Sequence, residues 1–380
     1  MKMYSRLAML VLAGGLMTTT HSYAAEDSQP PYTASELQSL ITDLETEGHF
    51  DSSHVYRQLS VHATTLAHYE DQGNNEKLVR HTGGFHNLLH HQKDAISDHA
   101  FDMLFHHGES LRAEYLPFDE DLAMEHIEHL SVEIGPRVAG SLEEVEAAEY
   151  IEDIFVDLGY ETSLEYFDIR NGTEESQNVI AIKEAEGIED PEIVYLTAHY
   201  DSIPNAPGAN DNGSGTAALL ELARVMQDIP VEKEVRFVAL GAEEIGLIGA
   251  YRYAETLSEE EINRSFGNFN MDMVATNWEP ADTLYVNVVD GQPNNVWHQA
   301  NSASNTLNND ILFLFQRGAS DHVAFHQVGI DAANFIWREP GTHSLEPWYH
   351  TPEDTIDKIS TEKLKMVGDL IYTSVTELDY

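Results

Sequence analysis

Hydrophobic and polar positions follow two different patterns along this chain, and the first of them is helical. Between residues 33 and 116 apolar side chains recur with a period of three to four. The first such face, with the spacing i, i+3, i+4, i+7 of an amphipathic helix, consists of Leu37, Leu40, Ile41 and Leu44. Gly48 follows as a stop signal. Further helical runs cover 52–70, 76–93 and 95–115. The pattern predicts a small bundle of three or four helices.

From about residue 119 the pattern changes to short apolar runs that alternate with helical ones. The predicted strands are 176–184, 192–200, 235–242 and 267–275, and the predicted helices are 143–160 and 216–227. Continuously apolar strands between helices are typical of a sheet that is covered on both faces. We therefore expect an α/β fold, a three-layer α/β/α sandwich with a mixed, mainly parallel sheet, preceded by the helical module.

The first 24 residues read as an export signal. Lys2 and Arg6 precede the apolar stretch 7–17, and Ser22-Tyr23-Ala24 offers a cleavage site between small residues. No later segment approaches the ~20 apolar residues of a membrane helix. The expected divisions are a signal peptide at 1–24, the helical module at 25–117, as an accessory domain or a propeptide, and the main domain at 118–380. The mature protein is expected to be periplasmic or secreted.

Composition narrows the possible partners and ligands. The formal charge is −46, so nucleic acid and anionic membrane surfaces are unfavourable partners. The chain has no cysteine, which leaves histidine and carboxylate side chains as the candidate metal ligands. The helical module holds eleven histidines. Metal capture and solvated helix faces are both open interpretations of them, and no tight ligand spacing favours the first.

Candidate metal ligands gather where the predicted strand 192–200 ends. His199 and Asp201 are two positions apart, so in extended backbone their side chains point the same way. Asp211 follows in a loop rich in Gly and Asn, just before a predicted helix. In open α/β sheets, sites form outside the carboxyl ends of the strands. The segment favours a metal site, although a polar loop would have a similar composition.

Two further strand ends and one late loop carry matching chemistry. Glu243 and Glu244 follow the strand 235–242, and apolar residues flank this pair, which disfavours a solvated acidic surface. Asp272 interrupts the apolar strand 267–275, where an isolated carboxylate is costly unless it is paired or ligated. His350 lies on a Pro-containing loop near the carboxyl terminus. Oxygen and imidazole donors of this kind suit zinc, with cobalt or manganese as substitutes.

At this point the chain resembles a known family, the secreted M28-type aminopeptidases with two co-catalytic zinc ions. The resemblance covers roughly 124–376, with the motifs IGPRVAGS, NVIA, AHYDS…GANDNGSG, ALGAEEIGLIGA, NMDM, SDHVAF and WYHTPEDTI in order. It implies that His199 and Asp272 bind one zinc ion, that Glu244 and His350 bind the other, and that Asp211 bridges the two. It further implies a general base at Glu243, a residue that orients His199 at Asp201, and an intermediate-stabilising hydroxyl at Tyr349.

The same resemblance implies the reaction: hydrolysis of N-terminal, apolar residues from peptides with a free amino group. Arg317 is a candidate substrate-binding residue. His322 and His343 are expected to be structural. Three alternatives remain open, namely a related carboxypeptidase, a glutaminyl cyclase, and a metal-binding ectodomain without activity. A carboxypeptidase would need a cation for the substrate carboxylate, for which only Arg317 and Arg338 are near in sequence.

Overall fold

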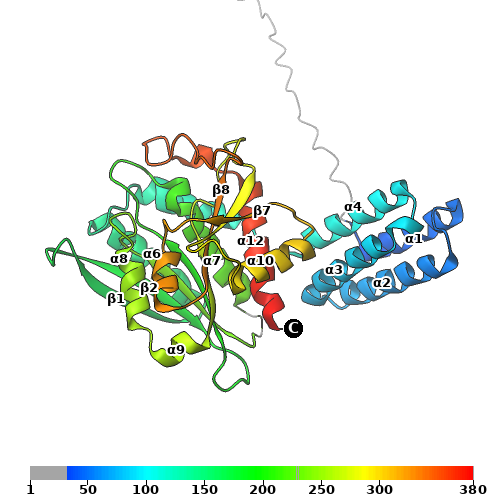
Figure 1. The fold of residues 1–380 in the computed structure, drawn as a ribbon, viewed down its shortest axis with the longest axis horizontal. Coiled ribbons are helices and arrows are strands. Elements are labelled where there is room, and N and C mark those ends of the chain that lie inside the picture. Colours follow the sequence, from blue (N-terminus) through cyan, green and yellow to red (C-terminus); the bar gives the residue numbers. More distant parts are fainter. Residues whose placement is uncertain (1–31, 228, 230, 380) are drawn as a thin grey trace, which may run out of the picture.

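The computed structural model describes residues 32–227, 229 and 231–379. The predicted signal peptide at 1–24 lies outside these residues. The described chain forms a bundle of helices beside a larger α/β domain (Figure 1). The expected α/β/α sandwich with a preceding helical module is therefore confirmed. The precise domain boundaries remain a prediction.

The helical module, as we call the first four helices, has a hydrophobic core of its own. The helices are α1 (Ala34–Glu47), α2 (Ser53–Asp71), α3 (Asn75–His91) and α4 (Asp98–Tyr115). A capping box joins Thr33 to Glu36 at the start of α1, and Gly48 ends this helix in the left-handed conformation. Leu37, Leu59 and Phe85 are fully buried in the core of the module.

One eight-stranded sheet forms the centre of the α/β domain. Its spatial order is β1-β2-β4-β3-β5-β8-β6-β7. Neighbours in the central block β4-β3-β5-β8 run parallel, whereas β1, β2 and β6 pair antiparallel with their neighbours in β1-β2, β2-β4 and β6-β8. The strands are β1 (Glu161–Ile169), β2 (Glu174–Lys183), β3 (Ile193–His199), β4 (Glu234–Leu240), β5 (Ser265–Met271), β6 (Thr283–Val288), β7 (Leu312–Gln316) and β8 (Ala332–Arg338). The sequence patterns predicted β2, β3, β4 and β5 but not the other four strands.

Helices cover both faces of this sheet. The larger layer shares the main core with one face and comprises α5 (Glu120–Glu128), α6 (Leu142–Asp157), α7 (Gly215–Met226), α10 (Asn295–Thr306) and α12 (Thr361–Thr376). The opposite face is covered by α8 (Ile248–Thr256), α9 (Glu259–Arg264) and α11 (His322–Val328), through a smaller core that includes Tyr195, Tyr253 and Phe325. Burial of the sheet on both sides explains why β3 has no polar face.

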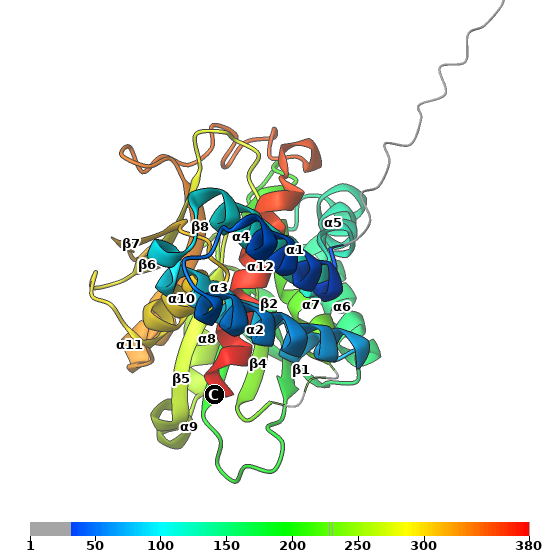
Figure 2. The same cartoon turned by 90° about the vertical axis from the view of Figure 1, so that its right-hand side faces the viewer.

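The helical module packs against the far ends of α7, α10 and α12, as Figure 2 shows from the side of the module. Helix α3 comes so close to α10 that a Cβ atom on Gly83 would lie 3.1 Å from Thr306 Cγ2. Beside this contact, module residues such as Val79 and Tyr115 enclose a cavity of about 350 Å³ together with Val225 and Tyr372. The module therefore contacts the α/β domain at this end, around a cavity.

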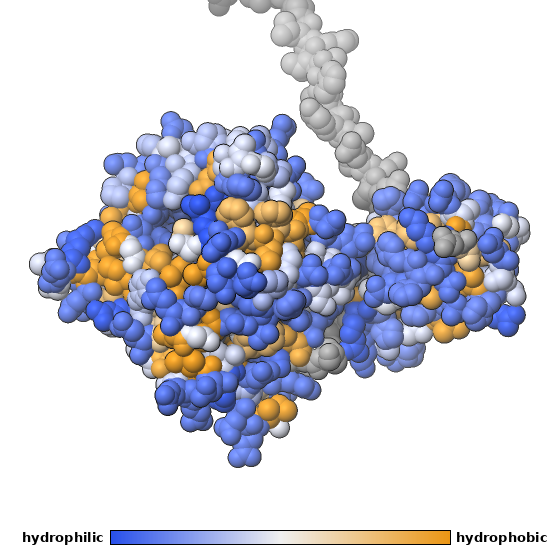
Figure 3. Space-filling view, in the orientation of Figure 1, coloured by the Kyte–Doolittle hydropathy of each residue, from blue (hydrophilic) through white to orange (hydrophobic). Residues whose placement is uncertain are grey.

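Hydrophilic side chains cover much of the surface of both parts (Figure 3), in keeping with the acidic composition. None of the helices in the described part of the chain is long and apolar enough to cross a membrane. The groups of side chains there that could hold a metal ion both lie in the α/β domain. The histidine-rich helical module forms no such group among its described residues.

Candidate metal centre

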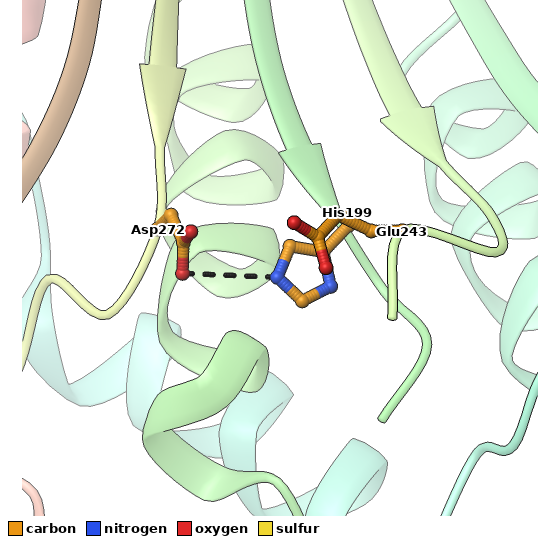
Figure 4. Close-up of side chains that lie close together, drawn as sticks. All are labelled: His199, Glu243 and Asp272. Carbon is orange, nitrogen blue, oxygen red and sulfur yellow. Dashed lines mark ion pairs between the residues drawn. The ribbon is translucent and has the colours of Figure 1, made fainter. Parts of the chain in front are cut away.

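Three adjacent parallel strands deliver candidate ligands to one edge of the sheet. His199 is the last residue of β3, Asp272 directly follows β5, and Glu243 follows β4. Figure 4 shows these three side chains beyond the strand ends, pointing toward one another. His199 Nε2 lies 3.7 Å from Asp272 Oδ1, and all three residues offer ligand atoms within 4.8 Å of one another. The parallel order of β4, β3 and β5 thus produces the first candidate metal group.

A second group lies beside the first and includes a residue from the carboxyl-terminal part of the chain. It consists of Asp211, Glu244 and His350. His350 Nε2 lies 3.1 Å from both Asp211 Oδ2 and Glu244 Oε2. The other oxygen of Asp211, Oδ1, lies 3.5 Å from His199 Nε2. Asp211 therefore presents one oxygen to each group, which is the geometry of a bridging carboxylate.

Buried oxygen atoms in both groups have no hydrogen-bond donor among the described residues. They include Asp272 Oδ1 and Glu244 Oε1. An unpaired buried carboxylate oxygen is costly, and a bound cation removes that cost. Two histidines and four carboxylates also form a donor set that suits Zn²⁺. The residues that are present therefore fit two metal ions.

The side chain of Asp201 holds the backbone of the β4 loop. Its two carboxylate oxygens accept hydrogen bonds from the backbone N–H groups of Glu243 at 3.0 Å and Glu244 at 3.2 Å. Oδ1 also lies 3.4 Å from His199 Nδ1, and the carbonyl oxygen of Asp201 lies 3.2 Å from the same nitrogen. The predicted contact with His199 is present. In addition, Asp201 links the β3 and β4 loops, which the sequence pattern did not indicate.

Two other buried carboxylates hold the loop of Asp211. Asp354 accepts hydrogen bonds from the backbone N–H groups of Asn210 at 2.8 Å and Asp211 at 3.0 Å. Glu346 accepts from the side-chain amide of Asn210 at 3.0 Å. Both acids belong to the loop that carries His350. The loop of Asp211 and the loop of His350 are therefore joined by these hydrogen bonds as well as by the contact between the two side chains.

The start of α7 fixes Asp211 from the other side. This residue lies in the irregular turn η3 (Ala209–Ser214), which leads into α7. A Cβ atom on Gly215 would lie 2.2 Å from the carbonyl oxygen of Met271, at the end of β5. Only glycine permits this close approach of helix and strand. The Gly-rich sequence around Asp211 is thus explained by packing as well as by the turn.

The pKa values of the clustered groups show how strongly they interact without a cation. Burial raises the pKa of Glu244 to about 7, and that of Asp321, whose two oxygens also lack donors among the described residues, to about 8. Hydrogen bonding to Asp211 and Glu244 raises the pKa of His350 to about 10. Burial also raises the pKa of Glu243 well above its usual value. Excess negative charge in a buried space favours occupation by cations.

Tyr349 and the two candidate arginines, Arg317 and Arg338, differ in their contacts and in their burial. Tyr349 stacks on His350, with ring centroids 3.8 Å apart. Arg317 is exposed after β7, and its carbonyl oxygen accepts a hydrogen bond from His322. Arg338 is buried, and the charge of Asp272 acts on its guanidinium. The role of Arg317 remains a prediction.

The sequence argument missed three residues near the site, Asp354, Arg137 and Glu346. Asp354 belongs to the motif WYHTPEDTI and Arg137 to IGPRVAGS, whereas Glu346 lies four residues before His350, outside any motif. Motif membership was thus the available signal for two of these three. Only the fold shows that they surround the same site.

The fold and the two groups define an α/β/α protein with a candidate centre for two metal ions. The sequence matches peptidase family M28 over residues 178–375, and the FIMAH domain over 34–113, which covers most of the helical module. The first match covers more than half of the chain. The chain therefore belongs to peptidase family M28.

Individual relatives agree with this assignment. Aminopeptidase YwaD of Bacillus subtilis is 56% identical over 202 residues, which are 53% of this chain and 44% of that protein. Leucine aminopeptidase 2 of Arthroderma otae is 34% identical over 48% of this chain and 41% of that protein. The chain thus matches less than half the length of these curated relatives.

The similarity to one solved structure extends over nearly all of that protein's chain. BSAP, a zinc aminopeptidase from Bacillus subtilis, superposes with a TM-score of 0.67 and 34% identity, over 69% of this chain and 96% of that one. A glutaminyl cyclase from Bacteroides thetaiotaomicron has a TM-score of 0.60 at 22% identity. The second likeness concerns the fold alone.

Proposed function

We propose that this protein is an exported aminopeptidase that hydrolyses N-terminal residues of peptides with two zinc ions. The observation that carries the proposal is the position of Asp211 between two groups of ligands, with Glu243 beside them. The similarity to aminopeptidase YwaD and to the zinc aminopeptidase BSAP supports the type of reaction. Export is supported by the sequence pattern of residues 1–24 alone.

His199 and Asp272 would hold one ion, Glu244 and His350 the other, and Asp211 both. Zinc held by these residues would supply a bound water molecule of lowered pKa and would polarise the carbonyl of the scissile bond. Glu243 takes the proton of the attacking water and passes it to the leaving amine. Asp201 keeps the backbone of Glu243 in place for this transfer. The hydroxyl of Tyr349 donates to the oxyanion that forms on the substrate.

The similarity to aminopeptidase YwaD supports a substrate with a free amino group. Two zinc ions would offset the charge of the four clustered carboxylates, so these carboxylates alone do not select the amino group. Directly after Asp272, Met273 joins a small apolar cluster with Tyr285, Ile336 and Phe315. Met273, Tyr285 and Ile336 are buried and Phe315 is partly exposed, so Phe315 is the member of the cluster that a substrate side chain would meet. We propose that it favours apolar N-terminal residues.

We expect the purified protein to hydrolyse leucine p-nitroanilide but not its N-acetylated form. A chelator should remove this activity because the proposed reaction depends on zinc held by the two groups of ligands. Added zinc should restore it. The absorbance of released p-nitroaniline measures the cleavage of both substrates. Equal cleavage of the acetylated substrate, or activity that survives chelation, would refute the proposal. Cyclisation of an N-terminal glutamine without hydrolysis would indicate a glutaminyl cyclase.

The docking of the helical module leads to a separate expectation. Burial raises the pKa of Asp369 to about 7 and also raises that of Glu377, and the charge of the buried Arg112 on α4 opposes both rises. Replacing Arg112 with alanine should lower the free energy of unfolding by about 1–3 kcal/mol, because it removes a buried charge that faces these acids, while Asp369 keeps its contact with Lys365. The value of kcat/KM for a small substrate should change less than twofold.

The small effect on activity follows from distance. Helix α7 starts beside Asp211 and runs for 12 residues, about 18 Å, before it reaches the cavity next to the module. Arg57→Ala, on the exposed part of α2, is the matched control and should leave stability unchanged. Denaturant titration and initial rates are the measurements. A large rise in kcat/KM for Arg112→Ala would instead indicate that the module inhibits the site.

A further inference from the structure

Arg137 is the largest fully buried side chain that the mechanism does not use. It lies between η2 (His129–Ile134) and α6, and its guanidinium is completely removed from solvent. Each hydrogen bond of this guanidinium in the described structure ends on a backbone carbonyl oxygen. Nε donates to Tyr200, Nη1 to Leu130, Gly135 and Pro207, and Nη2 to Gly208, over 2.7–2.9 Å.

Three of these carbonyl groups, those of Tyr200, Pro207 and Gly208, belong to the loop that separates His199 from Asp211 in sequence. Tyr200 lies between His199 and Asp201, and Gly208 lies three residues before Asp211. One planar guanidinium therefore joins both ends of the loop 200–208. Leu130 and Gly135 anchor the same guanidinium to a separate part of the chain, next to the π-helical turn η2.

The backbone of Arg137 is tied to the same loop. Its N–H group donates to the hydroxyl of Ser202 at 3.0 Å, and the N–H group of Ser202 donates to its carbonyl oxygen at 3.0 Å. Gly208 lies so close that a Cβ atom there would be 2.5 Å from the carbonyl oxygen of Asp211 and 3.0 Å from Arg137 Nη2. The loop is thus closed tightly around this one side chain.

Arginine has the donor geometry for this arrangement and lysine does not. Five N–H groups fan out in a plane from a guanidinium, whereas an ammonium group offers three donors on a flexible stem. The positive charge also opposes the acidity of the centre. The charges of Asp354, Asp201 and Asp211 act on Arg137 without a hydrogen bond between them in the described structure, while burial lowers its pKa to about 10.

We propose that Arg137 is a positioning residue for the metal centre, which fixes the backbone of 200–208 so that His199 and Asp211 reach the same ion. It does not touch the substrate or the metal ions; it acts through the carbonyl groups of Tyr200, Pro207 and Gly208. This inference rests on the proposed zinc-dependent function. It adds a determinant of zinc affinity that lies outside the ligand set.

The test compares the zinc affinity of full-length wild-type protein with that of Arg137→Lys, by competition with a chromophoric chelator. The variant should bind zinc about 10–100-fold more weakly, the usual effect of removing support behind metal ligands. At saturating zinc, kcat should recover to within a few-fold of wild type and KM should hardly change, because Glu243 and the ligands are intact. A purely structural role would lower the stability without changing zinc affinity.

Arg236→Lys is the matched control. Arg236 is also largely buried, but it pairs with Glu234 and Glu261 near the start of β4, at the opposite end of that strand from Glu243. We expect this variant to lose stability and to keep its zinc affinity. Equal zinc affinity in Arg137→Lys and wild type, with a loss of stability like that of Arg236→Lys, would overturn the proposal.

Ser202→Ala keeps the inference testable if Arg137→Lys does not fold. It removes the hydroxyl that accepts from the Arg137 N–H group and donates to the carbonyl of Ala206, but it retains the guanidinium. Zinc affinity should fall about three- to tenfold, less than for the lysine variant. Unchanged affinity would overturn the positioning role. Wild-type protein that binds no zinc would instead overturn the proposed function and this inference together.

Discussion

Replacing Glu243 with glutamine is expected to lower kcat by about 10²–10⁴-fold while the protein retains both zinc ions. This range is the usual contribution of a positioned acid–base group. Glutamine preserves the shape of the side chain and the backbone N–H group that Asp201 holds, but it cannot take a proton from water. Steady-state kinetics with leucine p-nitroanilide and metal analysis of the same samples test both parts of the expectation.

The outcome separates two roles that the geometry allows for Glu243. Its carboxylate has an oxygen atom within 4.8 Å of ligand atoms of His199 and Asp272, so it could also bind the ion that these two residues would hold. If the variant loses one equivalent of zinc together with its activity, Glu243 is a ligand and the assignment of the base is wrong. Glu353→Gln is the matched control. This residue is exposed on the loop that carries His350, and its substitution should leave activity and zinc content unchanged.

Replacing Asp211 with asparagine should affect both metal ions at once. An amide retains an oxygen atom but loses the negative charge that faces His199 on one side and His350 on the other. We expect the zinc content to fall from about two equivalents per chain to less than one. Most of the activity should be lost, and added zinc should not restore it. Glu244→Gln, in the second group alone, should reduce the content by about one equivalent.

The stability of the Asp211 variant offers an independent measurement. Without metal, Asp211 pairs with His199 and His350, which lowers its pKa to about 2 despite burial, so the removal of its charge should lower the melting temperature of chelator-treated protein at neutral pH. With zinc, wild type gains about 2.7 kcal/mol for each site at which the free ion is at 100 times its dissociation constant, and the variant should gain much less. A variant that zinc stabilises as strongly as wild type would contradict the bridging position of Asp211.

The central part of the fold could be predicted because its strands are buried on both faces. β3 and β4 read as continuous apolar runs, and their ends are marked by His199 and Glu243. β1 did not stand out because it lies at the edge of the sheet, where polar and apolar residues alternate and Tyr166 is exposed. Element type follows from local patterns, whereas the place of an edge strand depends on pairing with a distant partner.

The candidate site was predictable in its ligands but not in their support. Chemistry that is unusual for its surroundings marks Asp272 within an apolar strand and Glu243 at the end of another. Arg137, Asp354 and Glu346 carry no such local mark, because their function depends on carbonyl and N–H groups that only the folded chain brings to them. The same holds for the Arg338 guanidinium, whose relation to Asp272 arises from the pairing of β5 with β8.

The helical module and the candidate metal centre lie at opposite ends of helix α7. The module is attached where α7 and α12 end, and the candidate metal centre opens where α7 begins. Any cell wall, polymer or scaffold that held the module would thus hold the protein by its back, with the centre turned outward to the medium. With the proposed activity, immobilised protein could remove residues from passing peptide ends without detaching between turnovers.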